Sequence, residues 1–141
     1  MEDKVEVTVE VIIHATEDER KIFDSFLDVF GIEESEFTKE NLVGHYENPI
    51  TFVRAKITKS KAKSFIKKLV SSLPESELAE IIDDVENRIQ DSVLHIRLGK
   101  QELVKRNLVL QENDAVKVKI YTPVYSKKDT VRIYTKLLVL S

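Results

Sequence analysis

The sequence predicts a two-layer α+β domain in which helices cover one face of an antiparallel or mixed sheet. Apolar and polar residues alternate in several segments, as in strands with one buried face, and other segments carry apolar residues at helical spacing. The length of 141 residues, 42% of them hydrophobic and 33% charged, fits one domain over residues 1–141. There is no long apolar run and the first residues are polar and acidic, so we expect a cytoplasmic protein without a membrane partner.

The first strand is predicted over residues 4–14, where valines alternate with glutamate and threonine. Thr16 and Glu19 form a capping-box pattern, which predicts that a helix begins there. That helix should end at Gly31, because glycine readily adopts the left-handed conformation of a helix end. Its predicted core residues are Ile22, Phe23, Phe26, Leu27 and Phe30.

Two strands should follow, a short one near 37–44 and a longer one over 49–58. Ser60 is predicted to cap a helix that reaches Leu73, and Pro74 suits the start of the next helix.

Further strands are predicted at 92–98 and 115–122, and the segment 99–110 between them is less regular. A helix from Ser126 to Leu140 closes the chain, giving the order β-α-β-β-α-α-β-β-β-α when the segment 99–110 is counted as a strand. The residues of this last helix that we expect to face inward are Val131, Tyr134, Leu137 and Leu138.

Charge is distributed unevenly along the chain, whose formal net charge is −3. Residues 50–72 hold seven basic residues and no acidic one, whereas residues 1–49 hold four basic and 14 acidic residues. Such segregation can produce a local positive field on an acidic protein, which favours an anionic partner. The alternative is that helices and strands simply expose solvated charges.

If the apolar strand residues face the helices, the opposite face of the sheet carries basic and aromatic side chains from three strands. Basic groups pair with phosphates and aromatic rings stack on unpaired bases, so this combination suits RNA. The residues concerned are Phe52, Arg54, Lys56, His95, Arg97, Lys117, Lys119 and Tyr121, to which the first strand adds Glu6, Thr8 and Glu10. Lysines on the predicted helix after Ser60 offer a second basic surface, or a solvated helix face.

Motifs for catalysis or cofactor binding are absent from the sequence. There is no Cys, and His14, His45 and His95 are about thirty or more residues apart, without the spacing of a zinc site. The three glycines form neither a phosphate-binding loop nor a dinucleotide fingerprint. We therefore expect no enzyme activity, no metal and no cofactor.

Three segments together resemble a family of small archaeal RNA-binding proteins described as predicted exosome subunits. They are His14 to Glu19 (His-Ala-Thr-Glu-Asp-Glu), Gly44 to Ile50 (Gly-His-Tyr-Glu-Asn-Pro-Ile), and Leu98 to Gln101 (Leu-Gly-Lys-Gln) followed by Val116 to Ile120 (Val-Lys-Val-Lys-Ile). The resemblance implies a two-layer α+β fold similar to that of the ribosomal protein that binds five-S RNA. It also implies a non-catalytic role in RNA processing or translation.

The sequence therefore predicts a non-catalytic RNA-binding protein, working alone or as an accessory subunit of an RNA-processing complex such as the exosome. The predicted RNA-binding residues are His45, Tyr46, Phe52, Arg54, Lys56, Arg97, Lys100, Lys117, Lys119 and Tyr121. The alternative is a protein-interaction or assembly factor, whose acidic segments contact a basic partner and whose sheet face forms a homodimer.

Overall fold

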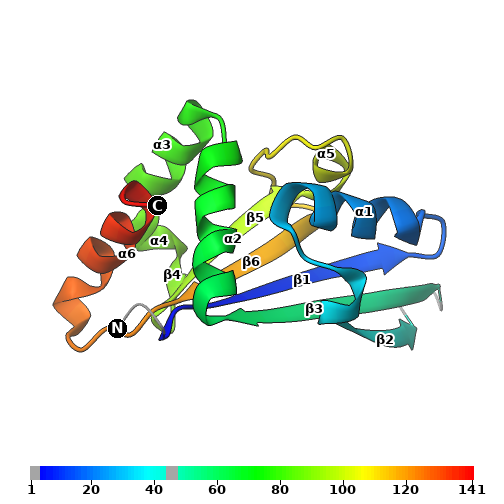
Figure 1. The fold of residues 1–141 in the computed structure, drawn as a ribbon, viewed down its shortest axis with the longest axis horizontal. Helices are drawn as coiled ribbons and strands as arrows, with labels where there is room; N and C mark the ends of the chain where they lie inside the picture. The colour runs from blue at the N-terminus through cyan, green and yellow to red at the C-terminus, as the bar shows by residue number, and fades with distance from the viewer. Residues whose placement is uncertain (1–3, 44–47) are drawn as a thin grey trace.

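The computed structural model describes residues 4–43 and 48–141, which form one open sheet covered by helices (Figure 1). The short 3-10 helices are marked η. In chain order the elements are β1 (Glu6–His14), α1 (Glu19–Phe30), η2 (Glu34–Glu36), β2 (Phe37–Val43), β3 (Pro49–Thr58), α2 (Lys59–Ser72), α3 (Glu75–Asp83), α4 (Val85–Arg88), β4 (Ile89–Gln90), β5 (Val93–Gly99), α5 (Lys100–Val104), β6 (Ala115–Tyr121), η4 (Lys127–Asp129) and α6 (Thr130–Val139).

The sheet has six strands in the order β2-β3-β1-β6-β5-β4, and every pair of neighbours is antiparallel. Figure 1 shows α1 and α5 over one end of the sheet and α6 with α3 and α4 at the other end, with α2 between them. The α+β class and the two-layer arrangement are thus confirmed, and the sheet is antiparallel rather than mixed.

The core lies between the sheet and the helices, because alternate strand residues turn their apolar side chains toward the helical layer. On β1 these are Val7, Val9, Val11 and Ile13, each at most 3% exposed. The rings of Phe30 on α1 and Phe65 on α2 stack with centroids 4.4 Å apart, which joins the two helices.

Several helix boundaries differ from the sequence-based expectation. Asp18, not Thr16, caps α1: its carboxylate accepts hydrogen bonds from the backbone N–H groups of Arg20 and Lys21. The helix ends at Gly31 as expected, with a φ of 73°. Leu27, expected in the core, is 48% exposed.

The later elements also contain differences. Helix α2 begins at Lys59, so Ser60 is not its cap. The irregular segment after Gly99 begins with helix α5. An additional strand, β4, precedes β5 and is joined to it by Asp91 and Ser92. Both residues have positive φ, as the central residues of a type I′ hairpin turn require. Helix α6 begins at Thr130, and Val131, expected inside, is 41% exposed.

A buried lysine connects three distant parts of the chain. Lys100, at the start of α5, is 1% exposed. Its Nζ lies 2.8 Å from the carbonyl oxygen of Ile12, 2.7 Å from Oε1 of Glu17 and 2.7 Å from Oδ1 of Asp114. Three acceptors match the three N–H donors of an ammonium group. Lys100 therefore stabilises the fold, and we correct its assignment as an RNA-contacting residue.

We predict that Lys100→Met lowers the free energy of unfolding by about 2–4 kcal/mol, because it leaves the mostly buried Glu17 carboxylate without its cation. Urea unfolding followed by circular dichroism measures this. Lys105→Met, at an exposed position just after α5, is the control and should change stability by less than about 0.5 kcal/mol. Equal small losses in both variants would contradict the structural role of Lys100.

Candidate nucleic-acid interface

The side of the sheet away from the helices, called the open face below, carries the strand residues that alternate with the core. It comprises Glu6, Thr8, Glu10, Ile12 and His14 on β1; Thr38, Glu40 and Leu42 on β2; Ile50, Phe52, Arg54 and Lys56 on β3; His95 and Arg97 on β5; and Lys117, Lys119 and Tyr121 on β6. Because strand register is fixed by the buried alternation, these positions are set by the core itself.

Basic residues occupy two adjacent rows across the open face. In the first row Arg54 lies opposite Glu10 on the neighbouring strand, Glu10 lies opposite Lys117, and Lys117 lies opposite Arg97. In the second row Lys56 lies opposite Thr8, Thr8 lies opposite Lys119, and Lys119 lies opposite His95. Since the rows are two residues apart along each strand, they are separated by about 7 Å. Strands β3, β6 and β5 thus contribute basic side chains to one region, and β1, between β3 and β6, contributes Glu10 and Thr8.

The ten predicted RNA-binding residues fall into three groups. Seven lie on the open face: Phe52, Arg54, Lys56, Arg97, Lys117, Lys119 and Tyr121. Lys100 is buried away from it, as described above. His45 and Tyr46 lie outside the described residues.

Glu10 is the acidic centre of this region. Its side chain is 12% exposed, and its carboxylate lies 2.7 Å from Nζ of Lys119 and 3.6 Å from Nε of Arg54. At the edges, Lys56 pairs with Glu6 at 3.8 Å and Arg97 with Glu112 at 3.6 Å. Within residues 4–43 and 48–141, Lys117 has no ion pair. Its ammonium group is therefore available to an anion without breaking an existing contact.

The pKa of His95 is lowered by its surroundings in the same region. Partial burial and the neighbouring charges of Lys119 and Arg97 hold the pKa of the His95 imidazole below its ordinary value. A neutral imidazole beside two cations can accept a proton when an anion approaches.

Apolar and aromatic groups lie beyond the two basic rows on either side, along the direction of the strands. At one end Ile12 is 42% exposed and pairs in register with Phe52, while Leu42 pairs with Ile50. At the other end Tyr121 pairs with Glu6 and is 39% exposed. Since Glu6 and Ile12 are six residues apart on β1, the two aromatic rings belong to positions about 20 Å apart.

A cavity of about 330 Å³ opens on this face where the loop before β6 approaches β1. Its floor includes Ile12 and Phe52, and Arg97 and Lys117 border it, together with loop residues 112–114. Sequence reasoning missed the loop contribution, because a short polar segment between two strands carries no periodic signal. The exposure of Ile12 was also missed, although its position on the strand implies it.

Two further observations limit the chemistry of the described part of the chain. None of its helices has the length and apolar character needed to cross a membrane. No three His, Asp or Glu side chains among residues 4–43 and 48–141 are arranged to hold a metal ion.

Known proteins share the fold of this chain. A crystal structure of an Archaeoglobus fulgidus protein from family DUF54 shares 33% identity, with a TM-score of 0.81, over 96% of this chain and 99% of that chain. A second DUF54 protein, from Sulfolobus solfataricus, shares 27% identity, with a TM-score of 0.74, over 93% and 97% of the two chains. An uncharacterised protein of Methanocaldococcus jannaschii is 23% identical over 129 residues, covering 83% of this chain and 86% of the relative.

A family model described as "RNA binding" matches residues 6–122, from the start of β1 to just beyond β6. The matched region contains β1, β3, β5 and β6, the four strands that the two rows cross. This chain therefore belongs to the RNA-binding family that the model describes, and its fold is shared with archaeal DUF54 proteins.

Proposed function

We propose that this protein binds unpaired RNA on its open face without catalysing a reaction on it. One observation carries the proposal: five basic side chains converge on one face of a chain whose net charge is −3. They are Arg54, Lys56, Arg97, Lys117 and Lys119. A local positive surface on an acidic protein favours binding at that surface over non-specific attraction to any polyanion.

Phosphates would bind along the two basic rows, beginning at Lys117, which has no ion pair among the described residues. Bases would stack on either side of the two rows, on Phe52 beside the cavity and on Tyr121. Aromatic stacking requires bases that are not already paired in a duplex, so single-stranded segments fit this face better than double helices.

The cellular role we propose is that of an accessory protein in RNA processing, in the exosome or in translation. This proposal is supported by the description of the family model and by the resemblance of the three sequence segments quoted above. A protein without a catalytic constellation would act there by holding RNA for other components.

The apolar end of the open face favours a second candidate function. Ile12 and Leu42 are 42% and 40% exposed and lie near Ile50 and Phe52, so they could contact a second copy of the chain. In that case the sheet face would form a homodimer. Light scattering with and without RNA, and after nuclease treatment, distinguishes a dimer held by protein contacts from one held by RNA.

We predict that changing Arg54, Lys56, Lys117 and Lys119 together to Glu weakens binding of a fluorescent single-stranded RNA by about a hundredfold or more at 50 mM salt. The slope of log affinity against log salt is negative, and it should become less steep by about three, since up to four phosphate contacts are lost. Fluorescence anisotropy measures both quantities.

The matched control changes Lys21, Lys67, Lys105 and Lys136 to Glu, which alters the net charge equally but at positions away from the open face. We expect this variant to keep most of its affinity. If both folded variants lose affinity equally, overall charge rather than the open face determines binding.

We predict that Glu10→Gln strengthens RNA binding about threefold to tenfold at low salt, because it removes the carboxylate that pairs with Lys119 and Arg54. The same titration measures the effect. Glu19→Gln on α1, whose carboxylate pairs with Lys39 away from the open face, should leave the affinity unchanged. Weaker binding by Glu10→Gln would show that Glu10 positions the cations rather than competing with phosphate.

We predict that RNA binds more tightly as the pH falls from about 7.5 to 5.5. In the free protein the pKa of His95 is lowered, so the imidazole is neutral near pH 7. A bound phosphate would raise that pKa, so binding takes up a proton and affinity rises with acidity. His95→Gln should remove most of this dependence, and an unchanged pH profile in that variant would place the titrating group elsewhere.

A further inference from the structure

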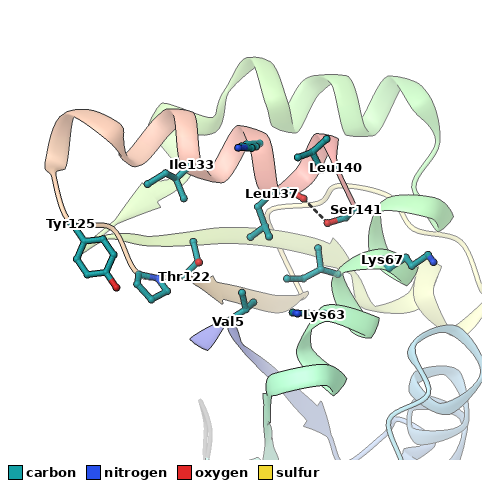
Figure 2. Close-up of a pocket in the computed structure, with 12 residues that line it drawn as sticks. Val5, Lys63, Lys67, Thr122, Tyr125, Ile133, Leu137, Leu140 and Ser141 are labelled. Carbon is teal, nitrogen blue, oxygen red and sulfur yellow. Dashed lines mark hydrogen bonds between the residues drawn. The ribbon is translucent and has the colours of Figure 1, made fainter. Parts of the chain in front are cut away.

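A second cavity lies on the helical side of the molecule, between α2, α6 and the segment that follows β6. Its volume is about 570 Å³. Figure 2 shows Leu137 pointing from α6 into the space above Val5, with Thr122 and Tyr125 at one end and Lys67 at the other. Ile66 and Ile133 complete an aliphatic floor. This cavity is called the α2–α6 groove below.

Two of the most exposed apolar residues among those described line this groove. Leu140 is 72% exposed and Tyr125 74% exposed, and both line it. Large apolar side chains that remain in water cost free energy, so a cluster of them indicates a surface that receives a ligand.

The border of the α2–α6 groove is positively charged. Lys63 and Lys67 lie one turn apart on α2, and Lys136 faces them from the last turn of α6. Among the described residues that line the groove there is no aspartate or glutamate. The four-methylene stem of each lysine adds apolar surface, while its ammonium group stays at the border. An aliphatic floor with a cationic border matches a ligand with a hydrocarbon chain and a negative head group.

The size of the groove distinguishes between kinds of occupant. Pockets for small ligands have volumes of about 300–1,000 Å³, which includes the value found here. A stable protein interface buries at least about 1,000 Å², more than a pocket of this size supplies by itself. RNA is also disfavoured, because the floor is aliphatic and Tyr125 is the one aromatic residue among the described lining residues.

We propose that the α2–α6 groove is a binding site for a small amphiphilic carboxylate, independent of RNA binding on the open face. The hydrocarbon chain lies along Ile66, Ile133 and Leu137, and the carboxylate is held by the ammonium groups of Lys67 and Lys136. The site is on the helical layer, whereas the open face is on the other side of the sheet, so both ligands can be bound at once.

The probe for this site is decanoate, added to the full chain with methyl-labelled isoleucine and leucine. We expect saturable chemical-shift changes at Ile66, Ile133 and Leu137 and none at Leu103, which is buried on α5. Decyltrimethylammonium has the opposite charge and a hydrocarbon chain one methylene longer, and it should bind at least about tenfold more weakly. Equal binding of the two amphiphiles would overturn the proposal, as would the absence of shifts at the groove.

The Lys67→Glu, Lys136→Glu double variant should weaken decanoate binding about tenfold or more while leaving RNA affinity unchanged. Its matched control is Lys21→Glu, Lys105→Glu, with the same charge change at exposed sites on and next to α1 and α5, which lie over the other end of the sheet (Figure 1). Both variants alter exposed side chains, so both should fold. The proposal is wrong if the control loses as much affinity, or if single-stranded RNA rather than decanoate shifts the groove methyl signals.

Discussion

The pairing of β1 with β3 on one side and β6 on the other determines which side chains share a face. The valines of β1 are almost completely buried, so a shift of the β1 register by one residue would bring Glu6, Thr8 and Glu10 into the core. The hydrophobic effect therefore fixes the register of the central strand, and the register aligns the basic side chains of β3, β5 and β6 in rows. The arrangement of the charged surface is a consequence of the packing beneath it.

The electrostatics of the open face depend on a balance rather than on basic residues alone. Glu10 is held between Lys119 and Arg54, and it reduces the mutual repulsion of cations that lie on neighbouring strands. The same carboxylate competes with any anionic ligand. The cations of this face are thus partly compensated, and Lys117 is the least compensated of them within the described part of the chain.

The alternation of apolar and polar residues predicted β1, β3, β5 and β6 and the open-face position of seven of the ten residues, and with the helical periodicity it predicted the two layers, but it missed the two-residue strand β4. Lys100 was misassigned because a sequence does not show that Ile12, Glu17 and Asp114 meet around one ammonium group. Those contacts join residues as far as 88 positions apart. The α2–α6 groove was equally hidden, since its walls come from separate segments and its two helical walls have the composition of ordinary amphipathic helices.

The strict division of each strand between core and open face has an evolutionary consequence. A substitution at an open-face position such as Glu10 or Lys117 changes the surface charge without removing any contact of the core residues. Ligand preference can therefore drift through many small changes while the fold stays intact. Proteins with this architecture can diverge in the nucleic acids they recognise long before their stability limits the divergence.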